Sequence, residues 1–229
     1  MASSTPNPAD QRFDLNEAFA FVFRSPGWFG KILIGALCIL ASFLIIPSWI
    51  LYGYMIQVSR EARGGGRQLP AWDRVAANLV DGLLYNVALL LWSIPCVVLI
   101  IVGVIVGGCS GSGAEGGSTS CANGSGLALF ISLGVLLGVV LIVVHPAIYA
   151  QFVAGGFGAS LRAGEVFRRA GRRVGLTLGM LLVGILVAIV AMLGIIGLFI
   201  AIVLTIPYAY FVLGNAYGQY TRLTDPPGA

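Results

Sequence analysis

Three long apolar blocks constrain the fold of this chain more than any other feature of its sequence. They run from Leu83 to Val106, from Leu127 to Tyr149 and from Leu176 to Leu213, and none contains an Asp, Glu, Lys or Arg residue. Each block reaches or exceeds the roughly 20 residues that a helix needs to cross the hydrocarbon layer of a bilayer. Buried helices of soluble proteins are rarely so long and so uniformly apolar. The sequence therefore predicts an all-α fold, a polytopic bundle of transmembrane helices.

The composition agrees with a membrane location. Hydrophobic residues make up 58% of the chain and charged residues only 10%, whereas a soluble domain has roughly 25% charged residues. The net charge of +4 is not a nucleic-acid signal, because Lys and Arg mark the cytoplasmic side of a membrane protein. The polar stretch Met1 to Asp10 does not resemble a cleavable signal peptide. We expect a multi-pass protein of the cell membrane. Its expected partners are membrane lipids, and we do not expect it to bind nucleic acid.

Other segments indicate how the chain enters and leaves the membrane. Residues 12–24 have apolar positions at helical spacing on one face, which favours a short helix in the interface. Residues 107–126 are almost wholly Gly, Ser and other small residues without Lys or Arg, so we expect a flexible outer loop. Residues 156–173 are expected to be a basic amphipathic segment at the cytoplasmic interface. We expect residues 1–229 to form a single integral membrane domain.

The number of spans depends on the first apolar run, Ile32 to Tyr54. As one helix it would be about 34 Å long, enough for a single span. Because Pro47 interrupts it, the run also suits a hairpin of two short helices. The hairpin places all thirteen Lys and Arg residues on the cytoplasmic side, whereas a single span leaves the three that precede it outside. The block 176–213 exceeds one span and is expected to turn at Gly194–Gly197. We favour six helices with a short first hairpin, and five spans is the alternative.

An internal repeat supports the hairpin. The motif Val-Phe-Arg, followed by two glycines at the same spacing, occurs in residues 22–35 and again in residues 166–179. Both copies continue with an apolar run, an Ile-Pro pair and a polar exit. If the two copies share one topology, the ends of both copies lie on the cytoplasmic side. Chance similarity between apolar stretches is the alternative.

Several short motifs along nearly the whole chain, taken together, resemble a known family. The motifs are Lys31-Ile-Leu-Ile-Gly35, Phe43-Leu-Ile-Ile-Pro47, Leu51-Tyr-Gly-Tyr54, Leu69-Pro-Ala-Trp-Asp73, Val80-Asp-Gly-Leu83, Pro146-Ala-Ile-Tyr-Ala150 and Gly156-Phe-Gly-Ala159. Their order and spacing resemble the prokaryotic membrane family called domain of unknown function 4013. The usual form of that family has an acidic residue or two near positions 64–68, where this chain has Gly and Arg. The resemblance implies a multi-pass membrane protein and no particular activity.

Two kinds of residue are candidates for covalent or metal chemistry. Cys109 and Cys121 flank the centre of the outer loop, and we expect them to pair as a disulfide where that side is oxidising. Two free thiols are the alternative. His145 is the only histidine, and no carboxylate or cysteine lies at helical spacing from it. We therefore predict a packing or interfacial histidine, with no metal site and no cofactor.

Basic residues near the membrane boundary are candidates for contacts with anionic lipid headgroups. They are Arg162, Arg168, Arg169, Arg172 and Arg173. Simple orientation signals are the alternative for these arginines.

Trp72, Asp73 and Asp81 form a second candidate motif at the interface. Helix capping and the helix dipole account for the two carboxylates. A ligand site that these residues share with Arg60 and Arg63 is the alternative.

Three Gly-x-x-x-Gly motifs, which begin at Gly103, Gly134 and Gly175, let helices approach closely. We expect them to serve packing within the bundle, and dimerisation with a second copy is the alternative.

The sequence favours a non-catalytic protein that interacts with lipid or with membrane partners. It has no nucleophile with an adjacent base, no acid–base pair and no metal set, so we do not expect an enzyme. A coupled transporter usually has ionisable residues inside the membrane, and the apolar blocks contain no carboxylate. A passive pore or a neutral-solute transporter is the alternative function.

Overall fold

The computed structural model describes residues 13–41, 46–107, 124–196 and 200–225, and within these ranges the chain is helical and contains no strand. The helices are α1 (Leu15–Arg24), α2 (Trp28–Leu40), α3 (Ile46–Arg63), α4 (Val75–Gly107), α5 (Gly124–Ser160), α6 (Ala163–Arg172), α7 (Val174–Ile196) and α8 (Ile200–Thr224). This confirms the expected all-α fold class. The outer loop with Cys109 and Cys121 lies outside the described residues.

Three helical stretches are long and apolar enough to cross a membrane: Val75–Ile105, Ala128–Ser160 and Val174–Met192. A fourth candidate exists where α1 and α2 count as one broken span, with a bend of 97° between them. The bend follows from local sequence, because Ser25 ends α1 and Gly27 adopts a left-handed φ of 68° before α2 begins. The described helices are thus compatible with a membrane protein of three or four spans.

The two ambiguous apolar regions are each divided between two helices. The run from Ile32 to Tyr54 leaves α2 at Leu40 and resumes in α3 at Ile46, so it is not one continuous helix. The block 176–213 likewise divides between α7 and α8. The helix order α1–α2–α3 therefore repeats as α6–α7–α8, a short amphipathic helix followed by two others, which is the order of the internal repeat in the sequence.

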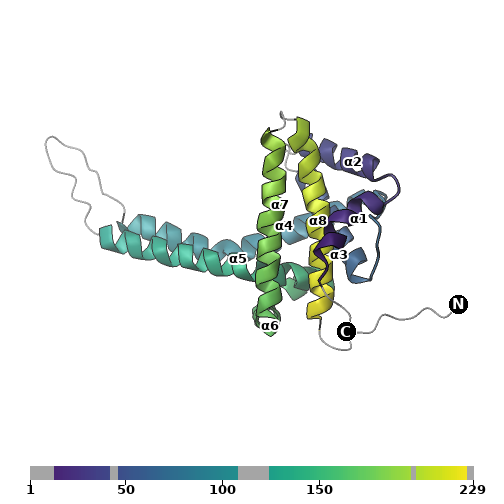
Figure 1. Cartoon of the computed structure of the whole chain (residues 1–229). Coiled ribbons are helices and arrows are strands. Elements are labelled where there is room, and N and C mark those ends of the chain that lie inside the picture. Colours follow the sequence, from purple (N-terminus) through teal and green to yellow (C-terminus); the bar gives the residue numbers. More distant parts are fainter. Residues whose placement is uncertain (1–12, 42–45, 108–123, 197–199, 226–229) are drawn as a thin grey trace, which may run out of the picture.

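Figure 1 shows two long antiparallel hairpins, α4–α5 and α7–α8, that extend from a shared core in different directions rather than side by side. Helix α3 lies in that core, packed mainly against α4 and α8. Away from the core the hairpins expose large apolar side chains, including Ile105 at 73%, Leu182 at 68% and Ile142 at 63%. Continuous apolar surface of this kind needs lipid or a partner to cover it.

Backbone contact between α3 and α4 fixes one side of the core. A Cβ atom on Gly53 would lie 1.7 Å from the backbone oxygen of Asn78, and one on Gly82 would lie 1.8 Å from the backbone oxygen of Trp49. Only glycine fits at both positions, because a backbone carbonyl cannot move aside as a flexible side chain can. The contact sets how the α4–α5 hairpin leaves the core.

A glycine pair on α8 fixes the other side of the core. A Cβ on Gly214 would lie 2.9 Å from the backbone oxygen of Met55, and one on Gly218 would lie 2.5 Å from that of Ser59. Gly214 and Gly218 form a Gly-x-x-x-Gly motif that our sequence analysis did not single out, although its spacing is the same. Of the motifs that we did single out, the pair at Gly175 and Gly179 faces open space.

The polar groups around His145 and Ser59 in the core pair with one another. The two ring nitrogens of His145 lie 2.8 Å from the Tyr85 hydroxyl and 3.2 Å from the Tyr217 hydroxyl. The Ser59 hydroxyl lies 2.9 Å from the Tyr149 hydroxyl and donates to the backbone oxygen of Gly214 at 2.8 Å. Buried polar groups cost stability unless they are paired. His145 is therefore a packing residue bonded on both sides.

Candidate anion-binding site

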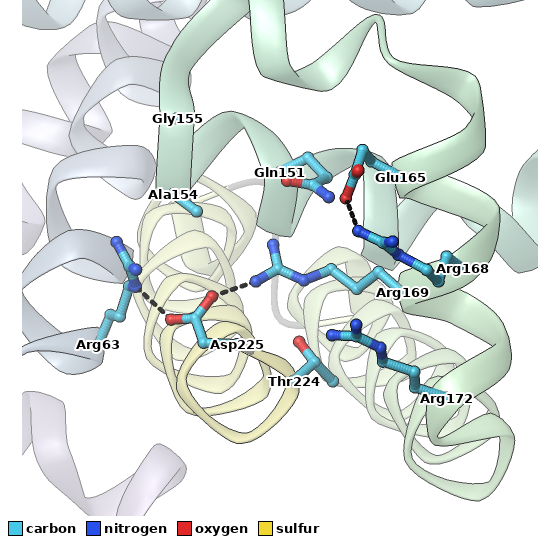
Figure 2. A pocket seen from close by; sticks show the side chains of 10 residues that line it. All are labelled: Arg63, Gln151, Ala154, Gly155, Glu165, Arg168, Arg169, Arg172, Thr224 and Asp225. Carbon is cyan, nitrogen blue, oxygen red and sulfur yellow. Dashed lines mark hydrogen bonds and ion pairs between the residues drawn. The ribbon is translucent and has the colours of Figure 1, made fainter. Parts of the chain in front are cut away.

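The ends of three helices and the short helix α6 meet around a pocket at the base of the α7–α8 hairpin. The pocket encloses about 650 Å³ of space, part of it open to solvent. Its lining comes from the end of α3, the end of α5, the helix α6 and the end of α8, and consists of Arg63, Gln151, Ala154, Gly155, Glu165, Arg168, Arg169, Arg172, Thr224 and Asp225. Figure 2 shows these side chains gathered from segments far apart in the sequence. We call this site the arginine pocket.

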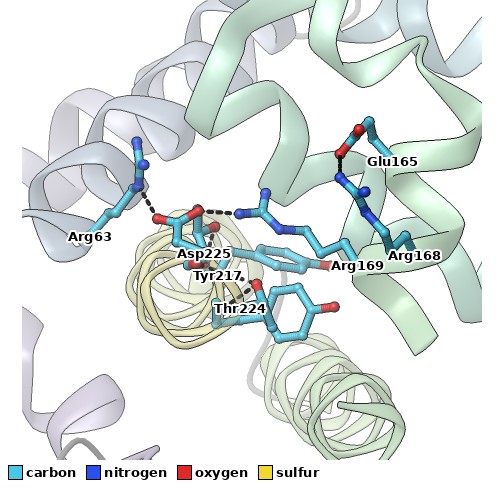
Figure 3. A network of polar contacts seen from close by, with 9 residues as sticks. Arg63, Glu165, Arg168, Arg169, Tyr217, Thr224 and Asp225 are labelled. Carbon is cyan, nitrogen blue, oxygen red and sulfur yellow. Dashed lines mark hydrogen bonds and ion pairs between the residues drawn. The ribbon is translucent and has the colours of Figure 1, made fainter. Parts of the chain in front are cut away.

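One carboxylate joins two of the arginines. The Asp225 side chain accepts a hydrogen bond from Arg63 Nε at 2.7 Å and, through its other oxygen, from Arg169 Nη2. Figure 3 shows Asp225 between the two guanidinium groups, at the end of α8. A carboxylate with both oxygens bound to guanidinium groups imitates the way in which arginines hold an external carboxylate or phosphate.

Arg169 is the most enclosed cation of the arginine pocket. Only 5% of its side chain is exposed, and its Nη1 atom is buried with no hydrogen-bond partner among the described residues. Burial lowers the pKa of the guanidinium, and the charge of Asp225 opposes that change. Arginine remains charged in proteins, so a buried donor without an acceptor is left on a side chain that lines the pocket. Such a donor costs stability until an acceptor reaches it.

The remaining charges leave the arginine pocket basic. Arg168 donates to Glu165 at 2.5 Å, and both side chains are more than two-fifths exposed. No ion pair joins Arg172 to a carboxylate in the described part of the chain. Four arginines and two carboxylates line the pocket, so cations are in excess. A planar guanidinium can hold two oxygens of a phosphate at once, so this arrangement suits an anion with several oxygens.

The structure brings together three of the five arginines that the sequence nominated for anionic lipid. Arg168, Arg169 and Arg172 line the arginine pocket. Arg162 and Arg173 flank α6 as its capping residues, are exposed and do not line it. Positions 165, 168, 169 and 172 share one face of α6. Arg162 and Arg173 have non-helical backbone conformations at the two ends of α6, so they leave that face.

Sequence reasoning missed two residues of this site. It considered Arg63 only as a partner of Asp73 and Asp81, and it did not single out Gln151 or Asp225. No local motif marks them, because tertiary packing brings them to the pocket, as in the ion pair between Arg63 and Asp225, which are 162 residues apart. The sequence led us only to expect these segments on the same side of the membrane.

The second candidate motif is divided between different contacts. The Trp72 ring stacks on Tyr54 with ring centroids 3.9 Å apart. Asp81 forms an ion pair with Arg60 through both carboxylate oxygens. Asp73 is exposed. The two contacts lie on different turns of α3, so the three residues do not converge on one ligand.

Metal ligands do not cluster in the part of the chain that the structure describes: no group of three or more His, Cys, Asp or Glu side chains is placed to hold an ion. Cys38 and Cys96 are free thiols. The predicted disulfide between Cys109 and Cys121 falls outside the described residues and stays a prediction.

Comparisons with known proteins agree with the family that the sequence motifs resemble. No curated protein and no solved structure matches this chain. The family described as "Protein of unknown function (DUF4013)" matches residues 36–216. These residues include all of α3, α4, α5, α6 and α7 and the larger, N-terminal part of α8. The match covers well over half of the chain, and the resemblance is thereby confirmed. This protein belongs to the DUF4013 family.

Proposed function

We propose that this protein is a non-catalytic membrane protein that binds the headgroup of an anionic phospholipid in the arginine pocket. The observation that carries the proposal is Arg169, a buried guanidinium with one donor nitrogen that no described residue satisfies. A phosphate oxygen is the kind of acceptor that would satisfy it. Phosphatidylglycerol is used below as the test lipid because its phosphate is its only charge.

The position of the arginine pocket favours lipid over a soluble anion. Helix α6 lines the pocket as far as Arg172, two residues before α7 begins, and α7 exposes apolar side chains beginning with Val174 at 54% and Leu178 at 51%. Phe167, on α6 itself, is 47% exposed. A charged pocket bordered by apolar surface matches an amphiphile with a charged head and hydrocarbon chains. Basic residues near an anionic membrane surface each contribute about 1 kcal/mol to binding.

A pair of matched double variants tests the proposal. Changing Arg168 and Arg172 to Gln removes two charges that line the arginine pocket, and changing Arg162 and Arg173 to Gln removes two from the same segment outside it. We expect the first variant to retain phosphatidylglycerol about tenfold more weakly than wild type, and the second to change retention less than threefold. Native mass spectrometry after extraction from mixed phosphatidylglycerol and phosphatidylethanolamine measures both. Equal losses of phosphatidylglycerol retention in the two variants would contradict a specific site and show that these arginines act only as a diffuse surface charge.

We further propose that the termini and the Arg60–Asp73 segment face the cytoplasm, with residues 107–126 outside, in a six-helix topology. The convergence of Arg63, α6 and the end of α8 on one pocket supports this, because residues that share a pocket share a side of the membrane. The test uses a variant in which serine replaces all native cysteines and one new cysteine is introduced at a time, at Ser4, Gly65 or Ser118. We expect a membrane-impermeant maleimide added from outside to label only the cysteine at position 118. Labelling of the cysteine at position 4 from outside would contradict the hairpin and favour the alternative of five spans.

A further inference from the structure

An apolar groove borders the arginine pocket along α5. It encloses about 690 Å³, part of it open to the surroundings, and its lining includes Leu89 and Trp92 of α4, Leu141, His145 and Ile148 of α5, and Leu181 of α7. Ile148 lines the groove and Gln151, one turn further along α5, lines the arginine pocket. The two spaces therefore lie on neighbouring turns of the same helix.

Helix α6 lines the arginine pocket and packs against residues of α4 and α5 that line the groove. Val166 is buried against Val144, Ala147 and Ile148 of α5, with Trp92 packed beside them. The Phe167 ring meets the Trp92 ring edge-on, with centroids 6.1 Å apart. On the adjoining face of α6, Arg168, Arg169 and Arg172 line the arginine pocket. One short helix thus presents an apolar side to Trp92 and Ile148, which line the groove, and a basic side to the arginine pocket.

The polar groups in the groove lining already have partners. Trp92 donates its Nε1 hydrogen to the Ser160 backbone oxygen at 2.9 Å. Both ring nitrogens of His145 lie within hydrogen-bond distance of the Tyr85 and Tyr217 hydroxyls. The groove therefore offers apolar contact and no unpaired donor or acceptor from these side chains. A hydrocarbon occupant suits it, whereas a polar solute would lose hydrogen bonds to water without replacement.

The groove is long enough for part of one acyl chain. From Leu141 to Ile148, the residues of α5 at the two ends of its lining, the helix rises about 10 Å, which lies within the roughly 15 Å depth of one leaflet of the hydrocarbon core. We propose that the groove holds an acyl chain of the same phospholipid whose phosphate lies in the arginine pocket. This inference rests on the proposed function, since the charged pocket selects the occupant. Head and chain would be held on neighbouring turns of α5.

A substitution that fills the groove tests binding of the acyl chain separately from binding of the headgroup. Leu181→Trp places a large ring in the groove, and Ile189→Trp, on an exposed turn of α7 that does not line it, is the matched control. We expect Leu181→Trp to weaken retention of dioleoyl phosphatidylglycerol at least about tenfold, the change that two methylene groups produce on losing apolar contact. Retention of dihexanoyl phosphatidylglycerol, whose chains are too short to fill the groove, should change less than twofold. The Ile189→Trp variant should retain both lipids as wild type does.

Each other outcome of this experiment contradicts the inference in a different way. Undiminished retention of dioleoyl phosphatidylglycerol by a folded Leu181→Trp variant would show that the groove holds no chain. Equal loss of both lipids would show that the substitution acts on the arginine pocket alone. Wild-type protein that retains neither lipid would overturn the proposed function as well. Quenching of tryptophan fluorescence by phosphatidylglycerol with brominated chains gives a second readout. The quenched fraction should fall in a Trp92→Phe variant, because Trp92 lines the groove.

Discussion

Replacing Gly82 with alanine is expected to lower the free energy of unfolding by about 3 kcal/mol, the upper part of the range for overpacking a close-packed interior. The added Cβ would lie 1.8 Å from the Trp49 backbone oxygen and 3.0 Å from the Gly53 backbone nitrogen. Backbone atoms of α3 would have to shift away from α4. Thermal unfolding in detergent, followed by circular dichroism, measures the loss as a lower midpoint.

Gly184 on α7 is the matched control, because no atom lies within 4 Å of a Cβ built there. Gly184→Ala is expected to leave stability unchanged or to raise it by up to about 1 kcal/mol, since alanine favours helix more than glycine does. A Gly82→Ala variant as stable as wild type would show that α3 and α4 do not approach each other at this point.

Replacing Asp225 with asparagine is expected to have two opposite consequences. Without lipid, Arg63 and the buried Arg169 lose the carboxylate that they share, and breaking a buried ion pair costs about 3 kcal/mol or more. With phosphatidylglycerol present, a phosphate takes the place of the carboxylate. Addition of the lipid should therefore raise the unfolding midpoint of Asp225→Asn more than that of wild type.

Glu165→Gln is the control for this second prediction. Glu165 pairs with Arg168 at the rim of the same pocket, where both side chains are largely exposed, so its loss should cost at most about 1 kcal/mol. The stabilisation that it gains from phosphatidylglycerol should be close to that of wild type. A lipid-dependent rise in Asp225→Asn no larger than in wild type would mean that no anion replaces the carboxylate.

Much of the secondary structure could be predicted from the sequence, because it depends on local composition. The apolar blocks became long helices, the division of residues 176–213 falls beside the expected Gly194–Gly197 turn, and Pro26 and Gly27 separate α1 from α2. The basic segment also contains the expected amphipathic helix, α6, although that helix starts only at Ala163. These features need no knowledge of distant contacts.

The arrangement of the helices could not be predicted in this way. In a membrane, apolar side chains gain little by turning towards one another rather than towards lipid, so hydrophobic patterning does not say which helices pack. The closest approaches to the backbone of another helix use Gly53, Gly82, Gly214 and Gly218. None of these four belongs to the Gly-x-x-x-Gly motifs that we singled out, of which Gly103 and Gly134 pack closely against side chains of the facing helix. The different directions of the two hairpins follow from such contacts (Figure 1).

The candidate site was predictable only in part for the same reason. The arginines of α6 were evident from their charge and their position at the interface. Which of them face inward depends on where α6 begins and ends, because Arg169 at 5% exposure lies within the helix, whereas the exposed Arg162 and Arg173 are its non-helical caps. The participation of Arg63 and Asp225 depends on the packing of α3 and α8 against the end of α5, which no local pattern encodes.

The most direct test of lipid binding is the structure of this protein determined in a nanodisc bilayer that contains phosphatidylglycerol. The expected result is a phosphate group in the arginine pocket, with its oxygens within hydrogen-bond distance of Arg169 Nη1 and of Arg168 or Arg172. The contrary result is a bilayer with resolved phospholipids around the apolar hairpins while the arginine pocket contains only Asp225 and solvent.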